Sequence, residues 1–151
     1  MIKGLVHLAL IATAGSCAMP SRAPASEVFV AVVAGERTLV GVARPRGYGG
    51  DFELKTLYEP AIDCVGNFRY DENGKGRANF KCTNNESGMI KLQSRGGLSG
   101  DGYGTSTLGP IKALFGYSLS QINRKMEFPG GRALQASEQG FKLISKDTST
   151  R

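Results

Sequence analysis

The segment CVGNFRYDENGKGRANFKC, residues 64–82, carries the strongest structural signal in the chain. Residues 71–76 at its centre are turn formers, and the runs on either side alternate apolar with polar side chains. A hairpin centred on Asn73 places Cys64 directly opposite Cys82. The same register forms one apolar face from the pairs Gly66–Phe80, Phe68–Ala78 and Tyr70–Gly76. A slip of one residue would lose this face and the facing cysteines, so we expect an antiparallel hairpin in this register.

Cys64 and Cys82 are expected to form a disulfide bond, because facing cysteines on neighbouring strands are close enough to bridge. Folding in an oxidising compartment favours the bond over two free buried thiols. A metal site would need further ligands, and the segment holds no histidine or third cysteine. The opposite face of the hairpin is polar and basic, with Arg69, Arg77 and Lys81.

Two β-branched runs, residues 28–34 and 38–43, flank the dipeptide Gly35-Glu36. Glycine at the first central position of a two-residue loop is typical of a type II′ turn, so these runs predict a second hairpin. Both of its faces are apolar, which places it in the middle of the core. Further strands are expected at residues 52–57 and 88–94, and a hairpin turn is expected at residues 99–102 in the glycine-rich segment 96–109.

The segment 111–126 is ambiguous. Its apolar residues recur at helical spacing, but alternation as far as Tyr117 favours a strand. We expect the strand to end near Tyr117 and a short helix to follow near residues 118–125. Residues 132–151 read as a polar tail with a candidate edge strand at 141–144.

These elements together predict an all-β fold, a small antiparallel meander of about seven or eight strands that forms a barrel or a sandwich. The β domain is expected to cover residues 28–131. A chain of 151 residues is long enough for one domain of ordinary size and too short for two.

Residues 1–16, MIKGLVHLALIATAGS, are typical of a secretory signal peptide. Lys3 supplies a positive charge, an apolar run follows, and small residues precede Cys17. The apolar run is too short to span a bilayer stably. Residues 17–27 are then expected to form a flexible tether to the β domain.

The run Ala14-Gly15-Ser16-Cys17 resembles the lipobox of bacterial lipoproteins, although that family usually has leucine at the first position. The resemblance implies that Cys17 carries acyl chains such as palmitate and that the mature chain begins there. Ala18, in place of aspartate, implies retention at the outer membrane. The alternative is a soluble periplasmic or secreted protein, cut by the ordinary signal peptidase after Ala18 or Ala23, which would discard Cys17.

Composition excludes several functional classes. The one histidine, His7, lies in the expected signal peptide, so a mature protein with histidine catalysis or a His-rich zinc site is excluded. The formal charge of +6 suits an anionic partner. The positive residues form no dense run, so nucleic acid is not an expected partner.

No motif in the chain predicts catalysis. The run GLSGDGYG, residues 97–104, lacks the Gly-Lys-Ser/Thr of a phosphate loop and reads as a tight turn. Asp71, Asn73 and Gly74 lack the other ligands of a calcium loop and predict an Asx turn. We therefore expect no catalytic, cofactor or metal residue, and a protein that is not an enzyme. The less favoured alternative is a carboxylate-dependent hydrolase built on two of Glu53, Glu59, Asp63 and Asp101.

Cysteines, glycines and aromatic residues form a recurrent pattern: Cys64-x-Gly66, Gly76, Cys82, Gly88, Gly100-x-Gly102-x-Gly104 and Phe115-Gly116-Tyr117. This pattern resembles small exported bacterial lipoproteins of unknown function, which implies a binding or structural module of the cell envelope. The segment Ser99-Gly100-Asp101-Gly102-Tyr103 is similar to one in the lipoprotein inhibitors of c-type lysozyme. That likeness implies an inhibitor or accessory factor for an envelope enzyme, although the spacing from Cys82 is shorter here and the tryptophan of those inhibitors is absent.

The basic face of the hairpin, formed by Arg69, Arg77 and Lys81, is the candidate contact surface. Like charges at this spacing on neighbouring strands repel each other, and an anionic partner would relieve the repulsion. The candidate partners are anionic lipid, cell-wall polymer and another envelope protein. The alternative is a solvated strand face with no partner.

Lipidation of Cys17 can be tested by metabolic labelling with a palmitate analogue. We expect label on the wild-type chain and none on Cys17→Ser, because the substitution removes the thiol that would be acylated. Label on both chains, or on neither, would contradict the prediction.

Overall fold

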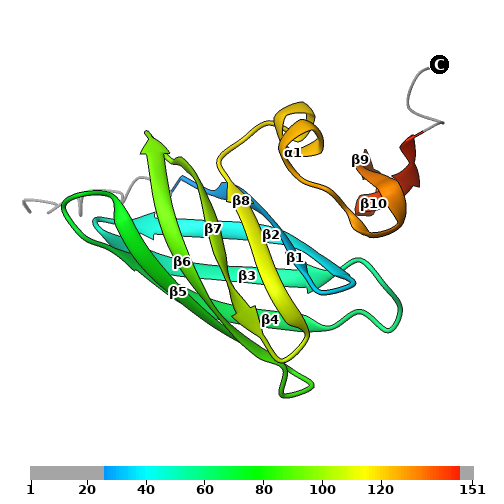
Figure 1. Ribbon diagram of the computed structural model, residues 1–151, viewed down its shortest axis with the longest axis horizontal. Coiled ribbons are helices and arrows are strands. Elements are labelled where there is room, and N and C mark those ends of the chain that lie inside the picture. The colour runs from blue at the N-terminus through cyan, green and yellow to red at the C-terminus, as the bar shows by residue number, and fades with distance from the viewer. Residues whose placement is uncertain (1–25, 147–151) are drawn as a thin grey trace, which may run out of the picture.

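The computed structural model describes residues 26–146 and shows a closed barrel of antiparallel strands (Figure 1). Each strand pairs with the next along the chain, and β8 pairs with β1 to close the barrel. The expected signal peptide, Cys17 and most of the tether lie outside the described residues. The barrel strands are β1 (Val28–Ala34), β2 (Arg37–Arg46), β3 (Gly49–Thr56), β4 (Asp63–Tyr70), β5 (Lys75–Cys82), β6 (Ser87–Gly96), β7 (Ser99–Ser106) and β8 (Gly109–Phe115).

A C-terminal unit follows the barrel. It consists of helix α1 (Leu119–Lys125), the 3-10 turn η1 (Pro129–Gly131) and a hairpin of β9 (Arg132–Ser137) and β10 (Gly140–Ser145). Ser118 begins the helix with a capping box, in which the Ser118 side chain accepts from the Gln121 amide and the Gln121 side chain accepts from the Ser118 amide. No helix within residues 26–146 is long and apolar enough to cross a membrane.

The structure confirms the predicted all-β meander and its short helix. The last barrel strand ends at Phe115, slightly before the expected end near Tyr117. Beyond the barrel, the edge strand expected at 141–144 lies within β10, and β10 pairs with β9 rather than with the barrel sheet.

The hairpin of β4 and β5 has the predicted register, and the predicted disulfide joins Cys64 to Cys82 across directly paired positions. The Asx turn is also confirmed. The Asp71 Oδ1 atom accepts hydrogen bonds from the backbone amides of Asn73 and Lys75, both at 2.9 Å.

Inside the barrel, aromatic rings lie against glycines of the neighbouring strands. Phe52 and Phe80 both pair with Gly66, one from each side. A Cβ atom on Gly66 would lie under 3.0 Å from the Phe52 ring and from the Asn79 carbonyl oxygen. The same arrangement recurs in the pairs Phe68–Gly50, Tyr70–Gly76, Phe80–Gly88 and Phe115–Gly100. Small residues thus make room for large ones, and eight strands can close around an interior that side chains fill.

The prediction of a turn at residues 99–102 is wrong. These residues belong to β7, and the turns lie on either side of that strand, at 97–98 and 107–108. A Cβ atom on Gly102 would meet Ile90 and Leu92 at 2.6 and 2.8 Å, because this glycine faces the crowded interior. Glycine is therefore needed within β7 for close packing rather than for chain reversal.

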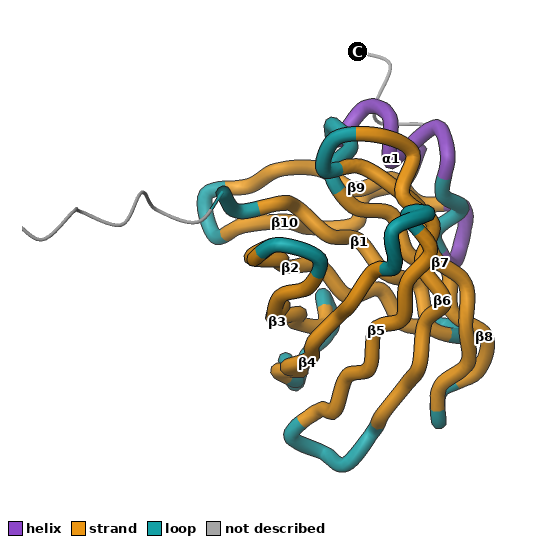
Figure 2. Tube along the Cα trace, turned by 90° about the vertical axis from the view of Figure 1, so that its left-hand side faces the viewer, coloured by secondary structure: helices purple, strands orange, loops and turns teal. Residues whose placement is uncertain are grey.

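The C-terminal unit covers the outer face of β1, β2 and β8, away from β4 and β5 (Figure 2). Phe29 stacks on Phe141 with ring centroids 4.6 Å apart. The Asn123 side chain bonds both the amide and the carbonyl of Leu134, at 2.8 Å each, and so ties α1 to β9. This cover explains why the segments 28–34 and 38–43 are apolar on both faces: one face lines the barrel and the other is buried beneath the unit.

The barrel is filled at the end that carries the disulfide. Cys64 and Cys82 lie there in the core, and the loop residues Ile62 and Leu108 pack against it. The Ile62 amide donates to Thr56 Oγ1 at 2.8 Å, which holds the loop between β3 and β4 in place. This end of the barrel is therefore packed with side chains.

Removal of the disulfide should destabilise the barrel. We expect the double variant Cys64→Ala/Cys82→Ala to lose about 2–5 kcal/mol in the free energy of unfolding, because the bond restricts the unfolded chain. Denaturant unfolding without reductant measures this loss, with Cys17→Ser as the control. Mass spectrometry of a non-reduced digest tests the bond itself, and two alkylated thiols at 64 and 82 would contradict it.

Gly66→Ala should also destabilise the barrel, since the new methyl group would enter space that the Phe52 ring occupies. We expect a loss of about 1–3 kcal/mol in the free energy of unfolding. Asn67→Ala, at the exposed neighbouring position, is the control and should change stability by less than about 0.5 kcal/mol. Equal effects of the two substitutions would argue against the packing role of Gly66.

Candidate functional site

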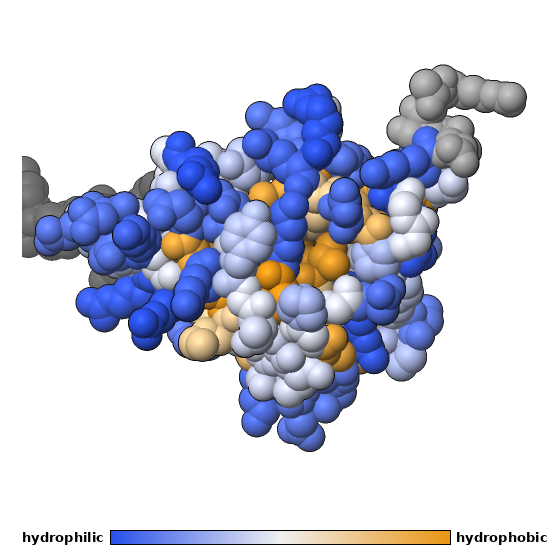
Figure 3. Space-filling view, viewed as in Figure 1, coloured by the Kyte–Doolittle hydropathy of each residue, from blue (hydrophilic) through white to orange (hydrophobic). Residues whose placement is uncertain are grey.

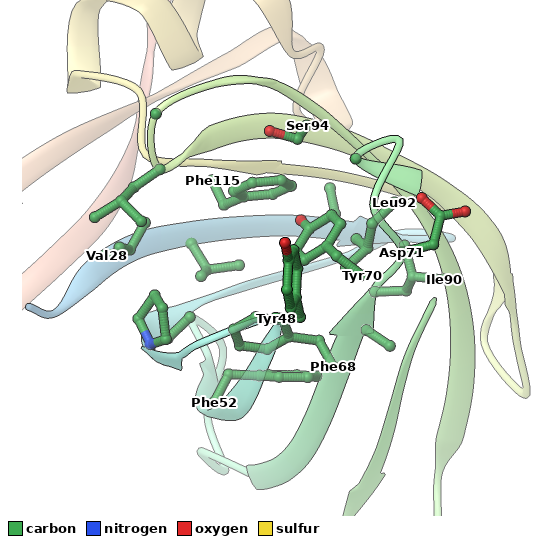
Figure 4. Close-up of a pocket in the computed structure, with 18 of the residues that line it drawn as sticks. Val28, Tyr48, Phe52, Phe68, Tyr70, Asp71, Ile90, Leu92, Ser94 and Phe115 are labelled. Atoms are coloured by element: carbon green, nitrogen blue, oxygen red, sulfur yellow. The ribbon is translucent and has the colours of Figure 1, made fainter. Parts of the chain in front are cut away.

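A cavity of about 300 Å³ lies inside the barrel, toward the end opposite the disulfide (Figure 4). Inward-facing side chains from several strands form its walls, among them Val30, Val32, Ala78, Ile90 and Ala113. The residues that line the cavity are overwhelmingly hydrophobic. The lining is apolar because side chains alternate along each strand, so that apolar ones point inward.

Three aromatic rings that line the cavity contact one another in turn. Phe68 and Tyr70 on β4 lie edge to face with centroids 5.9 Å apart, and Tyr70 lies 6.3 Å from Phe115 on β8. These separations fall in the range in which aromatic pairs attract each other. Each of the three rings is also paired with a glycine, which limits its movement. The wall is therefore a preformed surface for a flat or elongated apolar molecule.

Two turns flank the mouth of the cavity. Tyr48 follows β2 and Leu98 follows β6, and their side chains are 67% and 51% exposed although both line the cavity. The Tyr48 carbonyl accepts a hydrogen bond from the Tyr70 amide at 2.6 Å, which fixes the first turn to the end of β4. Figure 4 shows the rings of Tyr48 and Tyr70 close together in the cavity.

Two carboxylates supply the charge at the mouth. Asp71 and Glu72 lie on the turn between β4 and β5, and among the described residues that line the cavity no Lys or Arg balances them. Burial raises the pKa of the Tyr70 hydroxyl well above its ordinary value, and the negative charge of Asp101 adds to the shift. The phenol is therefore neutral at physiological pH and keeps its hydroxyl proton as a possible hydrogen-bond donor.

The predicted basic residues lie elsewhere, on the outside of the barrel. Arg69 and Arg77 are directly paired across β4 and β5, and Lys81 lies four residues further along β5 on the same face. All three side chains are exposed. The predicted clustering of these cations is thus present in the structure, on the opposite side of the sheet from the cavity.

The carboxylates considered for hydrolysis do not line the cavity. Glu59 is exposed in the loop between β3 and β4. Within residues 26–146 no three histidine, cysteine or acidic side chains form a group that could hold a metal. The other three carboxylates lie on the outer face, each beside a basic side chain, in the pairs Glu53–Arg44, Asp63–Lys55 and Asp101–Arg95.

Comparisons of the chain with protein-family models, with curated proteins and with solved structures find no match.

The sequence analysis placed Phe68 and Tyr70 on an apolar face but did not predict a cavity. A signal was present, since two glycines of that face lie opposite aromatic residues in the predicted register. The pattern shows that rings and glycines face each other. It does not show how much space is left once Phe115 from β8 meets Tyr70 from β4, because that depends on barrel closure.

Proposed function

We propose that this chain is an exported binding module of the bacterial cell envelope, held at the membrane through Cys17, and that it binds a small, mainly apolar molecule in the barrel. The observation that carries the ligand proposal is the apolar cavity of about 300 Å³, open at one end. Barrels of eight strands are just wide enough to hold one small ligand. The envelope location rests on the signal-like and lipobox-like start of the sequence.

The size of the cavity limits the ligand. It lies at the low end of the usual range for small-molecule sites and is about twice the volume that holds benzene in an engineered cavity. A molecule of two or three aromatic rings, or a short aliphatic chain, is the class that fits. Burial of its apolar surface against the rings of Phe68, Tyr70 and Phe115 would supply most of the affinity.

The residues at the mouth of the cavity determine which charge the polar end of the ligand can carry. Asp71 and Glu72 are negative, so a carboxylate or phosphate at the entrance would be repelled. The phenol groups of Tyr48 and Tyr70 offer hydrogen bonds. The ligand is therefore an apolar molecule whose polar end is neutral or positively charged, and the module acts by binding it rather than by changing it.

Binding can be measured with the neutral fluorescent probe N-phenylnaphthylamine and with its sulfonated analogue. We expect saturable fluorescence enhancement with the neutral probe and weaker binding of the sulfonate, because the carboxylates repel it. Ala78→Leu and Ala113→Leu each add a larger side chain to the cavity wall, and each should weaken binding at least about tenfold by occluding the site.

Ala136→Leu is the matched control, since Ala136 is exposed on β9 and far from the cavity. It should leave probe binding unchanged. Thermal unfolding identifies a variant that has lost its fold, and the use of two filling variants keeps the test valid if one of them is unstable. Unchanged binding in both folded filling variants would overturn the proposal.

A further inference from the structure

Basic side chains form a continuous row across the outer wall of the barrel. Strand pairing places Arg69 on β4 opposite Arg77 on β5, and Arg77 opposite Lys91 on β6. The row continues through Tyr103 on β7 to Lys112 on β8. Neighbouring strands lie about 4.8 Å apart, so the row spans about 19 Å of the wall.

The three exposed cations of this row, Arg69, Arg77 and Lys91, have no acidic partner among the described residues. By contrast, Arg44 lies 3.0 Å from a Glu53 oxygen and Arg46 lies 3.1 Å from an Asp51 oxygen. Like charges at directly paired positions oppose folding. The wall therefore carries an electrostatic cost that the fold itself does not require and that an anionic partner would remove.

Large apolar side chains are exposed on the same outer face as these charges. Val65 on β4, Met89 on β6 and Tyr103 on β7 are 62%, 47% and 56% exposed, and they point outward as the cations do. Figure 3 shows hydrophobic side chains reaching the surface between hydrophilic ones on the face turned to the viewer. A basic surface interspersed with tyrosine and aliphatic side chains matches the boundary between lipid head groups and acyl chains.

The two sides of the barrel are thus different. The C-terminal unit buries the outer apolar side chains of β1, β2 and β8, whereas nothing in residues 26–146 covers Val65 or Met89. The Lys112 ammonium group donates to the Lys125 carbonyl at 2.6 Å, so the row ends where the C-terminal unit begins. The uncovered wall therefore carries a row of cations that runs across the strands. It also carries exposed apolar side chains on β4, β6 and β7.

We infer that the outer wall of β4–β7 docks on the surface of an anionic lipid bilayer. Arg69, Arg77 and Lys91 contact the head groups, while Val65, Met89 and Tyr103 enter the interfacial layer. The exposed apolar side chains favour a bilayer over an anionic polymer, because a bilayer offers an apolar layer beneath its charged head groups. The inference rests on the outer wall alone and does not depend on the ligand cavity.

The test uses the expected mature chain, residues 17–151, with Cys17→Ser. In this variant no lipid at residue 17 holds the protein on the membrane. Sedimentation with vesicles of equal parts phosphatidylglycerol and phosphatidylcholine should show binding at low salt. Binding should weaken as the Debye length falls from about 30 Å at 0.01 M to about 8 Å at 0.15 M salt. Vesicles of phosphatidylcholine alone should bind far less.

The wall variant Arg69→Gln/Arg77→Gln/Lys91→Gln should weaken vesicle binding roughly a hundredfold, given the usual contribution of each cation near an anionic surface. Its matched control is Arg124→Gln/Lys142→Gln/Lys146→Gln, which removes the same charge from exposed positions of the C-terminal side. The control variant should lose much less of its vesicle binding. Equal losses in both variants, or no binding to the anionic vesicles, would overturn the inference.

A second variant separates a bilayer from an anionic polymer. Val65→Thr/Met89→Gln removes apolar surface but no charge, and it should weaken vesicle binding several-fold because the interfacial contacts are lost. Binding to soluble dextran sulfate should not change in this variant. Vesicle binding that is insensitive to Val65→Thr/Met89→Gln would indicate charge attraction alone, as for a polymer, and would overturn docking on a bilayer.

Discussion

The contact between an aromatic ring and a glycine on the next strand is the constraint on which the barrel depends. Gly66 lies between Phe52 and Phe80, and a methyl group there would overlap the Phe52 ring. At these directly paired positions the ring occupies the space that a side chain on the glycine would need. Because such pairs recur around the barrel, eight strands can curve tightly enough to close, and the strand edges that an open sheet would expose are removed.

This packing also determines where the cavity lies. At one end, the disulfide and the loop residues Ile62 and Leu108 fill the interior. At the other end, the rings of Phe68, Tyr70 and Phe115 are held against glycines at the wall, and the centre remains open. The cavity is thus the space left beside these rings, where Tyr70 on β4 and Phe115 on β8 approach each other across the barrel. Because the rings are held against glycines, its walls are rigid, which reduces the entropy lost when a ligand binds.

The outside of the barrel is divided in a similar way. The C-terminal unit buries the apolar outer side chains of β1, β2 and β8, and Phe141 and Asn123 contribute directly to that contact. The opposite wall keeps its charges and its exposed apolar residues. One protein therefore presents a covered side that stabilises the barrel and an open side that is chemically suited to a membrane surface, with the cavity opening at one end between them.

Local pattern alone determined much of this fold. The alternation in residues 64–82 predicted the hairpin register, the disulfide and the outward position of Arg69 and Arg77, because pairing within a short hairpin follows from the turn and from the period of two. The mixed signals near residues 111–126 still predicted a strand and then a short helix. The glycines at 100 and 102 were misread as a turn, since a glycine that reverses the chain and one that makes room for Ile90 look alike in sequence.

Contacts between distant segments were decided only by the tertiary structure. The row that joins Arg77 to Lys91 and Lys112 depends on the pairing of four successive strands, and no spacing within one hairpin reveals it. The cavity depends on the closure of β8 onto β1, which brings Phe115 to within 6.3 Å of Tyr70. Sequence periodicity predicts which way a side chain faces. The space between facing side chains depends on the curvature of the whole barrel.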